Sequence, residues 1–397
     1  MVSRAISPII AEDSKHYRII GIIGPRQSGK TTLARALFPN KRYANLEDPE
    51  QRAFALEDPK GFLSDRRGGL IVDEFQRVPD LLSYIQTISD EENVPGQFIL
   101  TGSQNFLMME QISQSLAGRI SLFTLMPFSL AELFKDGKVI PLLNDVLYRG
   151  FFPRLHTESM DPARYYQNYV RTYLERDVRL LKNIGDLSLF RNFLMMCAGR
   201  TGQLINYSSL GNDLGISHNT VKSWLTVLEA SNIVYLLKPF YRNFGKQIIK
   251  SPKIYFCDTG LLCFLLGMQK SDSITYHFLR GGIFENFVIC EFLKQRYNRG
   301  REGSLYFWRD KLGREVDLIV DEGQTHTIIE IKAGQTIAAG FFSSLDYYGS
   351  LESNCPPANR YLVYGGEENQ NRSKGKVRSW KCLVDTPFEM TQSAAAG

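Results

Sequence analysis

The stretch GPRQSGKTT, from Gly24 to Thr32, constrains the fold of this 397-residue chain more than any other feature. It has the spacing GxxxxGK[ST], it follows the apolar run IIGII, and it opens the helical pattern TTLARALF. A glycine-rich turn at the start of a helix directs backbone N–H groups toward phosphate oxygens. The stretch therefore predicts a phosphate-binding loop between a buried strand and a helix, with a turn of no chemical role as the alternative.

The side chains of this loop suit a nucleoside triphosphate bound with Mg²⁺. Lys30 is expected to reach the β- and γ-phosphate oxygens, and Thr31 is expected to offer its hydroxyl to Mg²⁺. Arg26 also has a simpler interpretation, as a partner in a surface ion pair. The residues predicted to cradle ATP are Gly24, Pro25, Arg26, Gln27, Ser28, Gly29, Lys30, Thr31 and Thr32.

Two later strands end in residues with the chemistry of nucleotide hydrolysis. In GLIVDEF, Asp73 is expected to complete the Mg²⁺ shell and Glu74 to polarise the attacking water. In FILTGSQ, Thr101, Ser103 and Gln104 either sense the γ-phosphate or the water, or close a strand-end turn. The predicted metal ligands are Thr31 and Asp73, and the predicted catalytic residues are Lys30, Glu74, Ser103 and Arg119.

Arg119, in QSLAGRI, is the least constrained of these residues. It is either the cation that neutralises transition-state charge, supplied to a neighbouring subunit, or an ordinary surface arginine. The first interpretation allows a homo-oligomer, but the sequence does not give the oligomeric state.

Composition sets the general class of the chain. With 43% apolar and 22% charged residues, it has the make-up of a folded globular protein of two or three domains. The cysteines at 197, 257, 263, 290, 355 and 382 have no CxxC spacing, which argues against a zinc site and favours a reducing cytosol. The longest apolar patch, residues 260–268, is about half a membrane span. We therefore expect a soluble, cytoplasmic protein without a membrane partner.

Six motifs occur in order along the chain: GPRQSGKTTLARALF, YANLEDPE, GLIVDEFQRVPDLL, FILTGSQ, SLAGRISLFTLMPFSLAEL and TYLERDV. The ordered set resembles the AAA+-type ATPases of bacteria and archaea in which a C-terminal domain of uncharacterised function follows the ATPase. The resemblance implies an AAA+ core, a winged-helix segment and a C-terminal domain similar to the PD-(D/E)xK nuclease fold. It also favours Arg119 as an arginine finger.

The expected fold class is α/β. Strands are predicted at residues 17–24, 68–74 and 96–103, in a parallel sheet with helices on both faces. A helix that starts near Gly281 is expected to precede three apolar strands. The predicted divisions are a P-loop AAA+ domain (1–136), a helical linker (137–198), a winged-helix segment (199–270), a nuclease-like domain (271–388) and a disordered tail (389–397).

A helix–turn–helix is predicted in YSSLGNDLGISHNTVKSWLTVLEASNIV. Gly215 makes the turn, Ser217 caps the second helix, and apolar residues from Val221 onward recur at helical spacing. The outward side chains are His218, Asn219, Lys222 and Ser223. They either contact a DNA major groove or belong to a lid or partner-binding surface.

The stretch VDLIVDEGQTHTIIEIKAG places charges inside two apolar strands. Glu330 and Lys332 alternate onto one face of the second strand, and Asp317 lies in the first. With Glu285 from the preceding helix, they match a PD-(D/E)xK site in which carboxylates hold a second Mg²⁺ or Mn²⁺ and Lys332 acts on water or phosphate. The alternative is the exposed face of a hairpin, which fits poorly with the burial cost of such charges.

Two functional hypotheses follow. The first is an Mg²⁺-dependent ATPase whose nucleotide state controls a DNA- or RNA-directed nuclease-like module. The second is a nucleotide-dependent switch or scaffold whose nuclease-like domain is catalytically silent and binds a protein partner. A small-molecule kinase is disfavoured, because it would leave the C-terminal half without a role.

Overall fold

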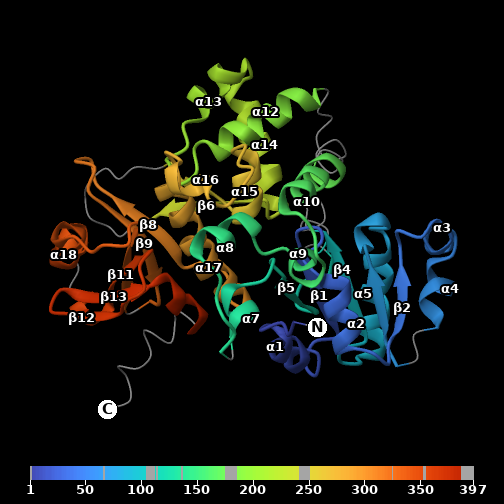
Figure 1. Ribbon diagram of the computed structural model, residues 1–397. Coiled ribbons are helices and arrows are strands. Elements are labelled where there is room, and N and C mark those ends of the chain that lie inside the picture. The colour runs from blue at the N-terminus through green and yellow to red at the C-terminus, as the bar shows by residue number, and fades with distance from the viewer. Residues whose placement is uncertain are drawn as a thin grey trace, which may run out of the picture. The chain divides into compact units, whose positions relative to one another are not determined.

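The computed structural model describes residues 2–65, 68–103, 112, 115–135, 137–174, 186–240, 251–323, 325–351 and 355–385 (Figure 1). Gln104 and the predicted tail at 389–397 lie outside the described residues. The chain divides into two compact units. The first comprises Met1–Phe128, Thr226–Ile233 and Arg296–Arg301, and the second comprises Ser129–Leu225, Val234–Gln295 and Glu302–Gly397.

A five-stranded parallel sheet forms the centre of the first unit. Its order is β2 (Arg42–Asn45), β3 (Leu70–Asp73), β4 (Phe98–Ser103), β1 (Ile19–Gly24) and β5 (Ile120–Thr124). Strands β1, β3 and β4 are buried along their whole length, because a parallel sheet covered on both faces takes apolar side chains on both. They are the three predicted strands. The edge strands β2 and β5 are half-buried and partly polar, so their sequence signal is weaker.

Helices cover both faces of this sheet, which confirms the predicted α/β arrangement. Ile19 and Ile23 of β1 pack in one core with residues of α4 and α5. Ile20 and Ile22 point to the opposite face and pack with residues of α1 and α2. The helices are α1 (Ser7–Asp13), α2 (Lys30–Leu37), α3 (Pro49–Glu57), α4 (Pro59–Ser64), η1 (Phe75–Arg77) and α5 (Leu81–Glu92).

The second unit begins with a helical region. Its elements are α7 (Leu130–Phe134), α8 (Leu143–Arg149), α9 (Pro153–Thr157), α10 (Pro162–Tyr169), η2 (Val170–Leu174), α12 (Leu187–Ala198), α13 (Tyr207–Leu214), α15 (Thr259–Leu265), α16 (Ser273–Tyr276) and the first part of α14 (His218–Ala230), whose residues from Thr226 onward belong to the first unit. Tyr166 of α10 donates to Asp258, which also accepts the N–H of Leu261 and so caps α15. Within the described residues, no helix is both long and apolar enough to cross a membrane.

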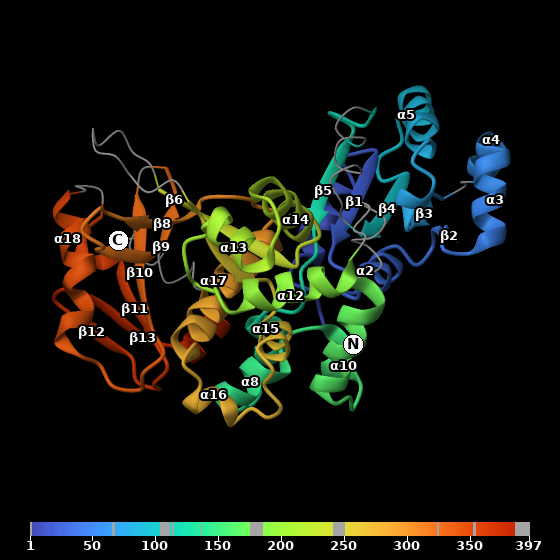
Figure 2. The same cartoon turned by 90° about the horizontal axis from the view of Figure 1, so that it is seen from above.

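A mixed sheet completes the second unit, in the order β12-β13-β11-β10-β9-β8-β6-β7. Its strands are β6 (Val234–Pro239), β7 (Lys253–Phe256), β8 (Leu305–Arg309), β9 (Glu315–Asp321), β10 (His326–Lys332), β11 (Arg360–Tyr364), β12 (Gln370–Arg372) and β13 (Gly375–Ser379). Its helical elements are η3 (Ala339–Phe342), α18 (Ser343–Leu351), η4 (Pro357–Asn359), η5 (Trp380–Asp385) and α17 (Arg280–Asn298), whose residues from Arg296 onward belong to the first unit. Figure 2 shows α18 beside β9 and β10, which it contacts.

The three apolar strands predicted after α17 are β8, β9 and β10, and the described chain has three further strands, β11, β12 and β13, that were not predicted. Of these three, β12 and β13 are short and carry Gln, Asn, Arg and Lys, so their apolar signal is weak. They extend the sheet beyond β11.

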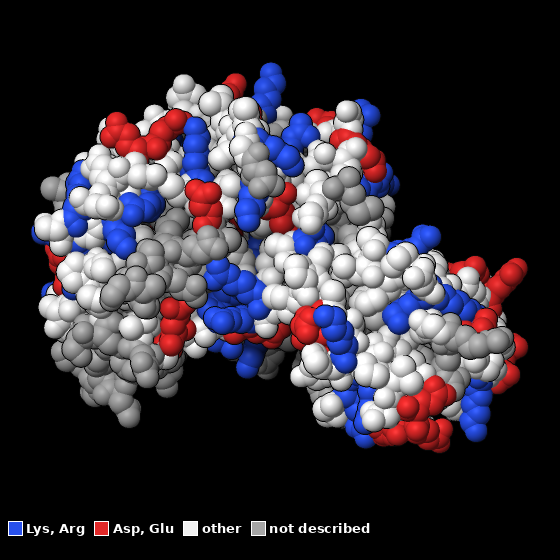
Figure 3. Space-filling view, turned by 90° about the horizontal axis from the view of Figure 1, so that it is seen from below, with Lys and Arg blue, Asp and Glu red and all other residues white. Residues whose placement is uncertain are grey.

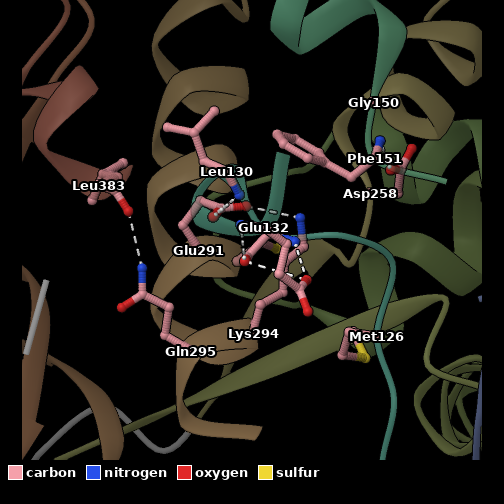
Figure 4. Close-up of polar contacts among 12 residues, drawn as sticks. Met126, Leu130, Glu132, Gly150, Phe151, Asp258, Glu291, Lys294, Gln295 and Leu383 are labelled. Atoms are coloured by element: carbon pink, nitrogen blue, oxygen red, sulfur yellow. Dashed lines mark hydrogen bonds and ion pairs between the residues drawn. The ribbon is translucent and has the colours of Figure 1, made fainter. Parts of the chain in front are cut away.

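Buried polar contacts fix α17 within the second unit (Figure 4). Lys294 pairs with Glu291 at 2.8 Å, and both side chains are almost fully buried. Glu291 also accepts the N–H of Leu130, and Lys294 lies over the ring of Phe151 with 3.6 Å from Nζ to the ring centroid. Burying such a pair is costly unless further contacts compensate it, and here both oxygens of Glu291 accept a hydrogen bond. These contacts hold the helix that also carries Glu285.

Candidate functional site

The predicted phosphate-binding loop lies at the carboxyl end of β1 and leads into α2. Gly24 has φ +145°, and a Cβ there would lie 2.3 Å from the carbonyl oxygen of Leu125. Gly29 has φ +94° and forms the N-cap of α2 in the left-handed region. Both positions therefore require glycine, and the loop brings the amino end of α2 to the edge of the sheet.

Lys30 and Ser28 are buried within this loop. The Nζ atom of Lys30 donates to the carbonyl oxygens of Gly24 at 3.2 Å and Pro25 at 2.8 Å. Ser28 is fully buried, and its Oγ has no hydrogen-bond partner among the described residues. A buried hydroxyl without a partner is costly, and a phosphate oxygen is a chemically suitable acceptor for it.

Asp73 collects hydroxyl groups from three segments of the first unit. Thr31 Oγ1 donates to its Oδ2 at 2.8 Å, Tyr43 donates to the same oxygen at 2.7 Å, and Thr101 donates to Oδ1. The carboxyl ends of parallel strands meet at one edge of a sheet, which is why β2, β3 and β4 all contribute here. Burial, and then the bond to Asp73, raise the pKa of Tyr43.

This grouping fits Mg²⁺. A hydroxyl and a carboxylate are oxygen ligands of the type that Mg²⁺ takes beside nucleotide phosphates. The structure thus brings together Thr31 and Asp73, the two residues predicted as metal ligands. Tyr43 was missed by sequence reasoning, although YANLEDPE places it in a strand just before a polar turn.

Glu74, Gln76 and Ser103 form a second polar group at the same edge. Glu74 has φ +54° at the end of β3, a backbone conformation uncommon for a glutamate. Gln76 Nε2 donates to Glu74 Oε2 and, at 2.9 Å, to Ser103 Oγ. Gln76 links two residues that were predicted separately. Its position two residues after Glu74 in VDEFQ is the only sequence signal for this role.

Arg26 lies near an acidic residue of the next loop, as its simpler interpretation expects. Its Nη1 is 4.0 Å from Glu47 Oε1, which Arg77 also contacts at 2.6 Å. Glu47 thus holds two arginines in the neighbourhood of the predicted phosphate site.

Arg119 is not brought to the phosphate-binding loop of its own chain. It immediately precedes β5, and its carbonyl accepts the N–H of Ile19, so it lies at the amino edge of the sheet. Two of its nitrogens contact the carboxylate of Asp90 at 2.7 and 2.8 Å, which raises the pKa of Arg119 and lowers that of Asp90.

The two helices and the turn of the predicted helix–turn–helix are present as α13 and α14. Gly215 has φ +69° and ends α13, and Ser217 Oγ accepts the N–H of Thr220 at the start of α14. His218, Asn219 and Lys222 are exposed, and Ser223 is half-buried. Strands β6 and β7 follow as an antiparallel pair.

The predicted charged residues of β9 and β10 lie on one face of the C-terminal sheet. Leu318 of β9 pairs with Ile329 of β10, which makes Asp317 and Glu330 neighbours across the strands. Lys332 Nζ lies 2.5 Å from Glu330 and 3.7 Å from Asp317. The backbone N–H of Ile331 donates to Asp317 Oδ2 at 2.8 Å. All three predicted residues are therefore in one cluster.

Glu285 joins this cluster through residues that sequence reasoning missed. Its Oε1 accepts from Lys253 at 2.9 Å and from Tyr255 at 2.6 Å, and Lys253 also pairs with Glu315. In the described chain, Glu285, Glu315 and Asp317 each place one oxygen within 4.8 Å of the other two. Glu315 could have been predicted from the sequence, because it precedes Asp317 by two positions in a strand and therefore lies on the same face. Lys253 and Tyr255 had no such sequence signal.

Burial and crowding of charge shift the titration of this cluster. Burial first, and Asp317 second, raise the pKa of Glu330 to about 8. Burial also raises the pKa of Glu285. Burial alone would lower the pKa of Lys332, but Asp317 and Glu330 outweigh it and the pKa is raised. Clustered carboxylates with raised pKa values fit a divalent cation, which would stabilise their ionised forms.

The parallel sheet, the glycine-rich loop and the buried Asp73 define a P-loop protein of the AAA type. A family model described as an AAA domain matches residues 16–134. Two models described as domains of unknown function, DUF8612 and DUF4143, match residues 140–272 and 280–383.

Sequence similarity to known relatives extends over most of the chain. Uncharacterized protein Rv2008c of Mycobacterium tuberculosis is 31% identical over 322 residues, which cover 80% of this chain and 71% of that protein. The chain belongs to the family of this protein. Uncharacterized protein MJ1544 of Methanocaldococcus jannaschii is 23% identical over 344 residues, covering 78% of this chain and 73% of that protein. The structure of the Walker-type ATPase PABY2304 of Pyrococcus abyssi is 16% identical, with a TM-score of 0.40, over 67% of this chain and 96% of that chain.

Proposed function

We propose that this protein binds ATP with Mg²⁺, hydrolyses it, and uses the nucleotide cycle to control a nucleic-acid-directed module in its C-terminal sheet. The observation that carries the first part is the contact between Thr31 and Asp73 beside a loop that places Lys30 at the head of α2. Backbone N–H groups and Lys30 bind the phosphates.

Hydrolysis requires a water held in line with the γ-phosphate. Glu74 accepts a proton from that water, and Gln76 fixes the Glu74 carboxylate relative to Ser103. Thr31 and Asp73 would hold Mg²⁺ beside the nucleotide, and the ion would supply neutralisation of phosphate charge. Arg119 lies at the opposite edge of its own sheet, so its proposed role belongs to the nucleotide of a neighbouring copy in a homo-oligomer.

The C-terminal cluster supports the second part of the proposal. Glu285, Asp317 and Glu330 are carboxylates suited to hold Mg²⁺ or Mn²⁺, which would supply Lewis-acid activation of a phosphodiester. Lys332 orients water or stabilises charge on the phosphate, since its ammonium faces both Asp317 and Glu330. DNA or RNA is the proposed partner of this module.

The segment around α13 and α14 adds a second surface for nucleic acid. We interpret α13, α14 and the β6–β7 pair as a winged helix with His218, Asn219 and Lys222 on its exposed side. The charge of the chain is only mildly positive, at +5. On the face drawn in Figure 3, Lys and Arg side chains lie interspersed with Asp and Glu. This mixture favours a local contact over a broad electrostatic one.

One observation favours the alternative of a silent, protein-binding domain. Lys253 already neutralises part of the carboxylate cluster, because it contacts both Glu285 and Glu315. The cluster is therefore partly satisfied by the protein itself.

An ATPase assay with added nucleic acid separates the two functions. Stimulation by DNA or RNA that falls steeply with salt supports the nucleic-acid-directed module. Unchanged turnover across all nucleic acids, together with no cleavage in Mn²⁺, contradicts it and leaves the switch. Lys332→Ala is the matched variant for cleavage, because it is expected to abolish cleavage while metal binding is retained.

A further inference from the structure

Lys253 of β7 is an unusual element of the C-terminal cluster, because its ammonium is nearly inaccessible to solvent. Its side chain is 3% exposed, and it contacts Glu285 at 2.9 Å as well as Glu315. An ammonium buried to this extent must be compensated by charge and hydrogen bonds. The two carboxylates provide both, so Lys253 is a fixed cation within a group of candidate metal ligands.

The two oxygens of each carboxylate in this cluster have different surroundings. Protein donors contact Oε1 of Glu285, Oδ2 of Asp317 and Oε1 of Glu330. The second oxygen of Glu330, Oε2, is buried and has no hydrogen-bond partner in the described chain. Glu330 is only 7% exposed, so water compensates little of this loss. This buried acceptor is an independent indication that the cluster takes a ligand.

In a site for two metal ions, the carboxylates would bridge the ions and would not contact protein cations as they do here. Two cations about 3.5–4 Å apart share carboxylates, and each needs several oxygen ligands. Here Glu285 and Glu315 each give one oxygen to Lys253, and Glu315 gives its other oxygen to Arg309 at 3.2 Å. One oxygen each of Glu285, Asp317 and Glu330 has no protein donor in the described chain, and three oxygens are enough in number for one cation completed by water.

We infer that Lys253 takes the place of a second cation, so that the C-terminal cluster binds a single divalent metal ion. This inference rests on the proposed metal-binding role of the cluster. Lys253 is a positioning residue in this account, because it holds Glu285 and Glu315 and contacts no substrate. Removing its charge should free both carboxylates and create room for a second ion.

Manganese stoichiometry tests the inference on the nucleotide-free full-length chain. Free Mn²⁺ is counted by its electron paramagnetic resonance signal during titration of the protein. Asp317→Asn is the reference variant, and the difference from the parental chain counts ions at this cluster only. We expect a difference of one ion for the parental chain and two for Lys253→Met. Lys376→Met, which removes a lysine from β13 in the same sheet, should leave the count at one.

The other outcomes are informative in distinct ways. A parental difference of two ions contradicts the role of Lys253 but keeps the proposed metal site. No difference between the parental chain and Asp317→Asn contradicts the metal site itself, and the inference with it. Circular dichroism checks that Lys253→Met is folded, and a folded variant that still binds one ion contradicts the inference. If it does not fold, Lys253→Gln takes its place as the variant without the charge, and a folded Lys253→Gln chain that binds one ion contradicts the inference.

Discussion

The hydroxyl of Thr31 lies 2.8 Å from Oδ2 of Asp73, although the two residues are 42 positions apart in the chain. The contact exists because α2 starts at the carboxyl end of β1 while Asp73 ends β3, at the same edge of the parallel sheet. The proposed Mg²⁺ chemistry depends on this meeting of strand ends.

Lys30→Ala should abolish ATP binding, because it removes the cation proposed to contact the β- and γ-phosphates. Isothermal titration calorimetry measures the effect directly. Lys41→Ala removes another lysine of the first unit, one that contacts the carbonyl of Gly68, and should bind ATP like the parental chain. Equal ATP affinity in Lys30→Ala and the parental chain would refute the assignment of the loop.

Gln76→Leu should lower kcat without changing KM for ATP, because Gln76 orients Glu74 and contacts no nucleotide in our proposal. We expect a loss on the order of tenfold, below the 10²–10⁴-fold that a general base typically contributes. Steady-state kinetics at saturating ATP give the result. A rise in KM with unchanged kcat would show that Gln76 acts in binding instead.

Arg119→Ala tests whether copies of the chain complete each other's sites. If Arg119 acts on a neighbouring nucleotide, the variant and Glu74→Gln are each slow alone, and mixing them restores part of the ATPase rate. Recovery occurs because some interfaces then combine an intact Arg119 with an intact Glu74. An Arg119→Ala chain with the parental rate would mean that its contact with Asp90 is purely structural.

Glu330→Gln should raise the melting temperature of the metal-free protein, and by more at higher pH. The pKa of Glu330 is about 8 in the folded chain against an ordinary 4.5. The neutral carboxyl is therefore favoured in the folded state, and it contributes fully to the free energy of unfolding only at low pH. That contribution is lost as pH rises from about 4.5 to about 8, and glutamine does not lose it. Thermal melts across this pH range measure the difference in melting temperature between the variant and the parental chain.

Added Mn²⁺ provides the control for this experiment. The ion should stabilise the parental chain more than Glu330→Gln. It should therefore narrow or reverse the difference in melting temperature between the two chains. A variant that melts below the parental chain at every pH without metal would contradict the account of a crowded carboxylate.

The residues of the first unit were largely predictable from sequence. The loop, Asp73 and Glu74 lie in contiguous motifs, and the order of a parallel sheet brings strand ends together without further information. Tyr43 and Gln76 were not predicted, because their roles arise from contacts between segments and not from a motif. Arg119 lies in a motif, but that motif does not indicate how far the residue lies from the phosphate-binding loop of the same chain.

The C-terminal cluster was predicted in part. The alternation of Glu330 and Lys332 along β10 places them on one face whatever the rest of the fold does. Lys253 comes from β7, at the far edge of an eight-stranded sheet, and its approach to Glu285 depends on packing of α17. No local pattern in the sequence encodes that contact.

The most direct test of the central claim is single-turnover hydrolysis of ATP by the Glu74→Gln chain beside the parental chain. We predict that the variant binds ATP with the parental affinity and hydrolyses it on the order of 10²–10⁴-fold more slowly, because the water loses its base. Hydrolysis at the parental rate, with binding intact, would contradict the proposed mechanism.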